Sequence, residues 1–150
     1  MTAPFARLTD KLYVAGQIDE ADIAAAAAAG VKTIVNNRLD DEELGQPAGA
    51  TIAAAAARHG LGYVAIPVGP GGLREDDPAR FAAILEDRGP ALAYCKTGFR
   101  SAALWAIGAA AAGAAPADLV ATAAEAGFDL SGQRPMLEAI AEDAAAKSGS

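Results

Sequence analysis

The chain has 150 residues, which fits a single domain (residues 1–150) long enough to bury a hydrophobic core. Its net charge of −7, with no basic stripe, argues against nucleic-acid binding. One cysteine excludes an internal disulfide and one histidine excludes a His-rich metal site, so we expect no metal or other cofactor.

The sequence gives no sign of a signal peptide or a membrane span. Residues 1–7 lack a hydrophobic signal core, and the apolar stretch 102–115 is too short to cross a bilayer. These features predict a cytoplasmic protein with no membrane partner. The single-domain length and the scarcity of large apolar residues favour a monomer.

Strand-forming and alanine-rich segments alternate in the first half of the chain. Leu12–Ala15 predicts a strand, and Asp19 suits the N-cap of a helix that runs over alanines to Gly30. The elements expected next are a strand at 31–36, a loop at 37–47, a second helix ending at 58–59 and a strand at 63–68.

The second half repeats this alternation. A Gly/Pro loop at 69–72 leads to Asp76-Asp77-Pro78, which predicts the start of a helix that ends near Gly89. Further expected elements are a strand at 91–94, a helix from 101 to about 113, helices after Pro116 and Pro135, and a frayed tail at 144–150. The alternation predicts an α/β fold with a mostly parallel central sheet flanked by helices.

The segment Cys95–Arg100 joins a predicted strand to a predicted helix, which is where open parallel sheets bind ligands. A thiolate needs electropositive surroundings, and a helix N-terminus supplies unpaired N–H groups. The pattern therefore predicts that Cys95 is a nucleophile and that Arg100 holds an anion beside it. A buried, inert cysteine is the competing interpretation. The other residues expected in the anion-binding loop are Lys96, Thr97, Gly98, Phe99 and Ser101.

Four segments in this order carry a family resemblance: Tyr13-Val14-Ala15-Gly16-Gln17, Thr33-Ile34-Val35-Asn36-Asn37-Arg38, Ile66-Pro67-Val68 and Tyr94–Ser101. Together they resemble the beta-lactamase-hydrolase-like, phosphatase-like family, whose fold is that of the protein tyrosine phosphatase superfamily. The resemblance covers about residues 8–113. It implies a phosphatase-like fold in which Cys95 is the nucleophile and Arg100 is the anion-binding arginine.

The length of the cysteine loop favours sulfur chemistry. Tyrosine and dual-specificity phosphatases have five residues between cysteine and arginine, whereas four separate Cys95 from Arg100. The loop is instead similar to the Cys-Arg-x-Gly-x-Arg loop of rhodanese sulfurtransferases. This similarity implies a sulfurtransferase that forms a Cys95 persulfide and takes thiosulfate or a persulfide as sulfur donor.

Two alternatives stay open. A phosphatase would hydrolyse phosphate monoesters such as phosphotyrosine through a Cys95 phosphocysteine, and it would need a general acid. A non-catalytic anion or redox sensor would use the same loop without turnover. Arg38 either lines the cleft or pairs with a neighbouring aspartate. The candidate general acids are Asp76, Asp77, Asp41 and Asp40. Helix capping is the competing role for Asp76 and Asp77, and a solvated turn is the competing role for Asp40 and Asp41.

Overall fold

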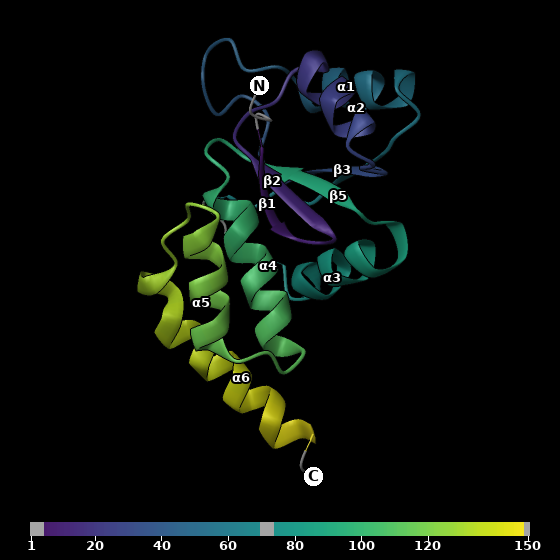
Figure 1. Cartoon of the computed structure of the whole chain (residues 1–150). Helices are drawn as coiled ribbons and strands as arrows, with labels where there is room; N and C mark the ends of the chain where they lie inside the picture. Colours follow the sequence, from purple (N-terminus) through teal and green to yellow (C-terminus); the bar gives the residue numbers. More distant parts are fainter. Residues whose placement is uncertain (1–4, 70–73, 149–150) are drawn as a thin grey trace.

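A mixed five-stranded sheet forms the centre of the molecule (Figure 1). The computed structural model describes residues 5–69 and 74–148. Strands β2, β5, β3 and β4 are parallel, and β1 pairs antiparallel with β2 at one edge. The predicted α/β fold with a mostly parallel sheet is therefore confirmed. The strands are, in spatial order, β1 (Ala6–Thr9), β2 (Leu12–Ala15), β5 (Ala91–Tyr94), β3 (Thr33–Asn36) and β4 (Gly62–Ala65).

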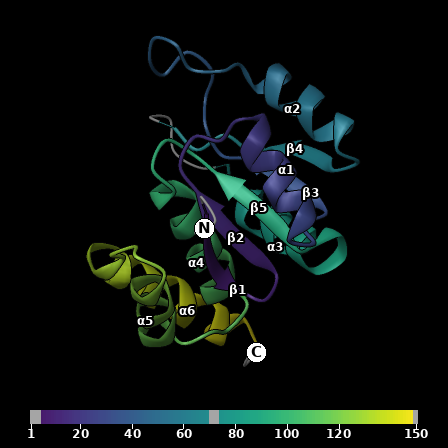
Figure 2. The ribbon, with the colours of Figure 1, turned by 45° about the horizontal axis from the view of Figure 1, so that its top comes forward.

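Helices cover both faces of the sheet (Figures 1 and 2). Alternate strand residues point to opposite faces, so Ile34 packs in the apolar cluster with α1 and α2, while Val35 packs in the cluster with α3 and α4. Helices α5 and α6 lie against α4 and extend the second cluster. The helices are α1 (Glu20–Ala28), α2 (Gly49–Arg58), α3 (Asp77–Arg88), α4 (Phe99–Ala111), α5 (Pro116–Glu125) and α6 (Arg134–Ser148).

Four local features differ from the sequence prediction. The edge strand β1 and a short 3₁₀ helix at Ser131–Gln133 were not expected. Strand β4 ends at Ala65 and not at 68, and Pro67 just beyond it has no N–H to donate. Helix α6 continues to Ser148 where a frayed tail was expected, and the pair of Lys147 with Asp143 at 2.9 Å supports its last turn.

The parallel strands bring four loops to one edge of the sheet. Beyond the strand ends, the Cys95 N–H donates to Ala15 O at 3.3 Å and the Asn37 N–H donates to Tyr94 O at 2.8 Å. The Val68 N–H then donates to Asn37 O at 3.0 Å. These bonds fix the loops after β2, β3, β4 and β5 beside one another. Within the described part of the chain, no helix is long and apolar enough to span a membrane.

Candidate active site

Cys95 lies at the base of a tight loop between β5 and α4. Its side chain is buried, and its Sγ accepts a hydrogen bond from the Gly98 N–H at 3.1 Å. Gly98 has φ +96°, and a Cβ there would lie 2.8 Å from the Phe128 ring. Only glycine fits this conformation and this contact without strain. The loop therefore points at least one backbone N–H at the sulfur, as the sequence predicts for a thiolate-stabilising loop.

The remaining loop residues divide into exposed and buried ones. Lys96 and Thr97 are exposed, and Lys96 Nζ lies 3.6 Å from Glu43 Oε2. Phe99 is half-buried and packs against the apolar cluster that contains the buried residues of α4. Ser101 is fully buried in the first turn of α4, and its hydroxyl has no hydrogen-bond partner among the residues described.

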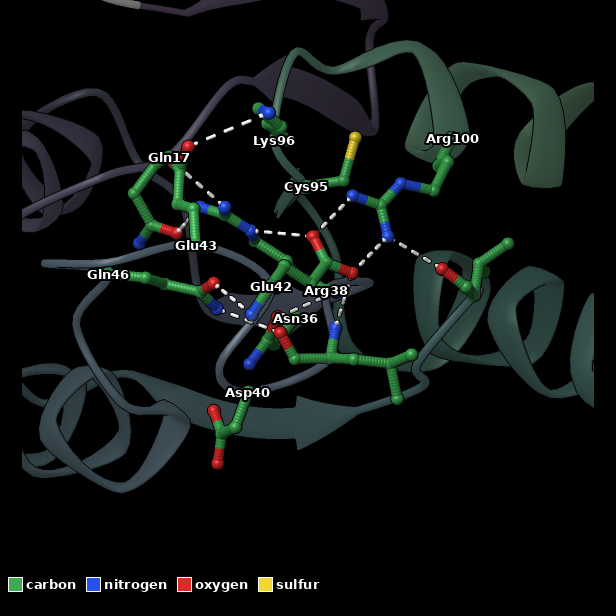
Figure 3. A network of polar contacts seen from close by, with 12 residues as sticks. Gln17, Asn36, Arg38, Asp40, Glu42, Glu43, Gln46, Cys95, Lys96 and Arg100 are labelled. Carbon is green, nitrogen blue, oxygen red and sulfur yellow. Dashed lines mark hydrogen bonds and ion pairs between the residues drawn. The ribbon is translucent and has the colours of Figure 1, made fainter. Parts of the chain in front are cut away.

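Arg100 is held from the side opposite Cys95 (Figure 3). Its Nη1 donates to Glu42 Oε2 at 2.6 Å and to Val68 O at 2.7 Å. Its Nη2 donates to Glu42 Oε1 at 2.7 Å. This end-on pair with a carboxylate is a strong, directional contact. It fixes the plane of the guanidinium next to the sulfur.

Arg38 lies behind this pair and has no exposed side-chain surface. Its three nitrogens donate to Glu42 Oε1 at 2.8 Å, Gln17 Oε1 at 2.7 Å and Glu43 Oε1 at 2.8 Å. Of the two alternatives for Arg38, the pairing with Asp40 or Asp41 is wrong, because the guanidinium donates to Glu42 and Glu43 instead. Arg38 is a buried anchor that does not face the cleft with a free guanidinium group.

Glu42 is ionised throughout the ordinary pH range. Hydrogen bonds from Arg100 are the largest cause, and with those from Arg38 they lower its pKa from 4.5 to about 2 against the opposing effect of burial. The hydrogen bond from Arg38 similarly lowers the pKa of Glu43. The same contact with Glu42 raises the pKa of Arg100, and the charge of Cys95 adds to this increase. Glu42 is thus a fixed anion and not a proton donor.

The four candidate general acids lie in different places. Asp40 and Asp41 line an open cleft of about 500 Å³ together with Glu42 and Arg100. Asp40 Oδ1 already accepts the Gly49 N–H at 2.8 Å, whereas Asp41 is exposed and has φ 61°, a conformation that only a few non-glycine residues adopt. The structure thus brings these two aspartates, and no other candidate acid, to the cleft of Arg100.

Asp76 and Asp77 lie outside that cleft. Asp76 occupies the N-cap of α3 but makes no side-chain capping bond. Asp77 is buried, and its Oδ2 accepts the Arg74 N–H at 3.0 Å, so it stabilises the turn that leads into the helix. The predicted capping role is therefore wrong for the side chain of Asp76. The Gly/Pro loop expected before these residues falls partly at 70–72, outside the described residues.

The sequence does not single out Glu42 and Gln17, although both contact the site arginines. In the sequence, Glu42 is one of four consecutive acidic residues, and Gln17 ends the first of the four segments that carry the family resemblance. Two sequence features point to these contacts: an arginine two residues after the end of a buried strand, and glutamates four and five residues beyond that arginine. The contact with Arg100 spans 58 positions, so local patterns do not reveal it.

The sheet order and the cysteine loop at the β5–α4 junction define the class of the molecule: it has the fold of the protein tyrosine phosphatase-like enzymes. Residues 4–112 match the family described as "Beta-lactamase hydrolase-like protein, phosphatase-like domain". The chain belongs to this family, and the predicted family resemblance is confirmed.

Individual relatives agree with this assignment. A beta-lactamase hydrolase-like protein of Agrobacterium fabrum is 38% identical over 105 residues, which are 69% of this chain and 24% of that protein. The chain spans less than a third of the length of the curated relatives it matches. A solved structure from Neisseria meningitidis, provisionally named a phosphatase, is 32% identical with a TM-score of 0.83, covering 93% of this chain and 99% of that one.

A more distant structure shares the fold alone. Pseudomonas aeruginosa TpbA, solved with a Cys-to-Ser substitution and in complex with phosphotyrosine, is 17% identical with a TM-score of 0.63. It covers 96% of this chain, and this chain matches 82% of it.

Proposed function

We propose that the protein is a sulfurtransferase that works through a Cys95 persulfide. One observation carries the proposal: Glu42 is the only carboxylate hydrogen-bonded to Arg100 in the described part of the chain, and it is held ionised. The group nearest the anion-binding arginine therefore cannot donate a proton. Sulfur transfer suits such a site, because its leaving group is already a stable anion.

The reaction takes two steps. The Cys95 thiolate attacks the outer sulfur of thiosulfate, a new S–S bond forms, the S–S bond of thiosulfate breaks, and sulfite leaves with the electron pair. A nucleophile such as a small thiolate then attacks the outer sulfur of the Cys95 persulfide and restores the Cys95 thiolate. The Gly98 N–H and Arg100 would stabilise the anions at each stage.

Hydrolysis of phosphate monoesters is the second candidate. The family and the solved relatives favour it, since phosphatases share this fold. In this reaction Cys95 attacks phosphorus, the ester oxygen leaves with a proton from a general acid, and water then cleaves the phosphocysteine. Asp41, exposed in the same cleft as Arg100, is the best-placed acid, followed by Asp40.

Intact mass spectrometry after brief exposure of the reduced protein to thiosulfate tests the proposal. We expect wild type, and not Cys95→Ser, to gain one sulfur atom that cyanide or a thiol removes. A parallel assay with an aryl phosphate tests the alternative. If wild type releases phosphate, Asp41→Asn does not, and no persulfide forms, the proposed function would be phosphatase activity and not sulfur transfer. Anion binding with neither reaction would indicate a sensor.

A further inference from the structure

We propose that a second anion-binding subsite adjoins the cleft of Arg100 and holds a carboxylate of the thiol that accepts sulfur from Cys95. The subsite is a hollow of about 470 Å³, which we call the arginine pocket, and its charged lining residues are Arg74, Arg80 and Asp77. The acceptor is thus assigned to a chemical class, a small thiol that carries a carboxylate. Since this acceptor takes part in the proposed sulfur transfer, its assignment rests on that function.

The arginine pocket and the cleft of Arg100 are neighbouring hollows with a shared wall. Leu39 and Gly69 line both of them. The two residues are in close contact, because Leu39 Cδ1 occupies the space that a Cβ on Gly69 would need. A molecule whose anionic end is bound at Arg100 therefore extends over Leu39 into the arginine pocket. The apolar part of the lining, which includes Ala65 and Pro67, suits a methylene chain between two charged ends.

The charges in the arginine pocket favour an anion. The Arg74 side chain is exposed and makes no hydrogen bond or ion pair with the residues that the structure describes. Arg80 makes one long contact among them, from Nη1 to Asp77 Oδ1 at 3.4 Å. Asp77 is buried and its Oδ2 already accepts the Arg74 N–H at 3.0 Å, so it offsets one arginine at most. The lining thus keeps a positive charge in a chain whose net charge is −7, and such a local field attracts anions.

A carboxylate on the sulfur acceptor matches this pocket. An arginine guanidinium presents parallel donors that fit the two oxygens of a carboxylate. Thiosulfate is far smaller than the two hollows together, so the sulfur donor does not need the arginine pocket. In the second step the acceptor thiolate attacks the outer sulfur of the Cys95 persulfide, the S–S bond breaks, Cys95 leaves as the thiolate, and the acceptor becomes a persulfide. Its carboxylate then lies at Arg74 and Arg80.

The experiment compares sulfur transfer from thiosulfate to ω-mercaptocarboxylates of three to six carbons with transfer to mercaptoalcohols of equal length. At the best length we expect wild type to have a KM for the carboxylate that is about fivefold lower than for the alcohol. The double variant Arg74→Gln/Arg80→Gln should lose this preference. Arg88→Gln is the matched control and should keep it, because Arg88 is exposed at the other end of α3 and lines neither hollow.

A binding measurement without chemistry separates the subsite from the proposed function. In a Cys95→Ser background, calorimetry compares ω-sulfocarboxylates, whose sulfonate replaces the anion at Arg100, with alkanesulfonates of equal length. We expect the sulfocarboxylates to bind more tightly, and the double variant, but not Arg88→Gln, to lose the difference. Should the double variant not fold, Arg74→Gln alone carries the comparison, because the Arg74 side chain bonds to no other described residue.

The outcomes distinguish the subsite from the proposed function. Sulfur transfer with equal KM values for carboxylates and alcohols at every length, or a preference that survives in the double variant, would overturn the subsite and leave the proposed function intact. Absence of transfer to every thiol, with no persulfide on Cys95, would overturn the proposed function. The sulfonate comparison then decides on the subsite alone: equal binding of sulfocarboxylates and alkanesulfonates refutes it.

Discussion

At the scale of single residues, the shape of the cysteine loop depends on Gly98. Its φ of +96° costs an L-amino acid about 1–2 kcal/mol. A Cβ would also lie 2.8 Å from the Phe128 ring and 3.2 Å from Val14. The Gly98 N–H also donates a hydrogen bond to Cys95 Sγ at 3.1 Å. Backbone strain, packing and the environment of the sulfur are therefore coupled at this position.

Gly98→Ala should destabilise the protein by about 2–4 kcal/mol, because the positive φ and the close Phe128 ring both oppose an added Cβ. Urea unfolding measures this loss. Gly30→Ala is the matched control, since Gly30 has the same φ but no neighbour within 4 Å. Equal losses in the two variants would contradict a role for the Phe128 contact.

Glu42 should make the stability of the protein depend on pH in the acid range. Its folded-state pKa of about 2 lies below the ordinary value of 4.5, so its contribution is complete above that value and is lost as the pH falls toward 2. The free energy of unfolding of wild type minus that of Glu42→Gln should shrink over this window. Urea titrations at pH 6, 4, 3 and 2 measure it, and a pH-independent difference would refute the effect.

At the scale of helices and strands, much of the fold follows from the sequence because the signals are local. Asp19 and Asp22 form a capping box at the start of α1, and Gly30 with positive φ follows its end. β1 gave no comparable signal, because its four residues alternate weakly and gain their stability from pairing with β2. Strand β5, which leads directly into Cys95, was predictable from its continuous apolar run.

The sequence predicts only those site residues that lie close together along the chain. Cys95, Gly98 and Arg100 lie in one loop, so their spacing predicts their association. The carboxylate that holds Arg100 comes from a loop more than fifty positions earlier, and only the parallel register of β3 and β5 brings the two together. Asp76 and Asp77 are the nearest candidate acids after Ile66-Pro67-Val68 in the sequence, but the fold places them outside the cleft that Arg100 lines.

Helix α4 carries Arg100 and Ser101, so its docking on α3 positions the loop. Gly108 is the point of closest approach: a Cβ there would lie 2.9 Å from Pro78 O. Gly108→Ala should therefore destabilise the protein by about 1–3 kcal/mol despite the better helix propensity of alanine. Thermal unfolding checks this. Gly132→Ala, in the 3₁₀ helix with no neighbour within 4 Å and no positive φ, should be neutral or slightly stabilising.

At the scale of the whole molecule, the C-terminal helices belong to the same core as the site. The family match ends at residue 112, near the end of α4, yet Leu119, Leu130 and Leu137 are buried in the cluster that contains Leu104 of α4. Figure 2 shows α5 and α6 lying against α4. Phe128, between these helices, lies next to Gly98 of the cysteine loop. The outer helices thus support the element that presents Arg100.

Leu137→Ala should therefore lower the free energy of unfolding by about 2–5 kcal/mol, the cost of a buried Leu truncation. Met136, its neighbour on α6, is 42% exposed, so Met136→Ala should change stability by less than about 0.5 kcal/mol. Denaturant unfolding compares the two variants. The proposed sulfur transfer, measured in Leu137→Ala, should persist at low temperature and fail at a lower temperature than in wild type. Unfolding of α5 and α6 in a separate, earlier transition would contradict a shared core, because one cooperative core predicts a single transition for all six helices.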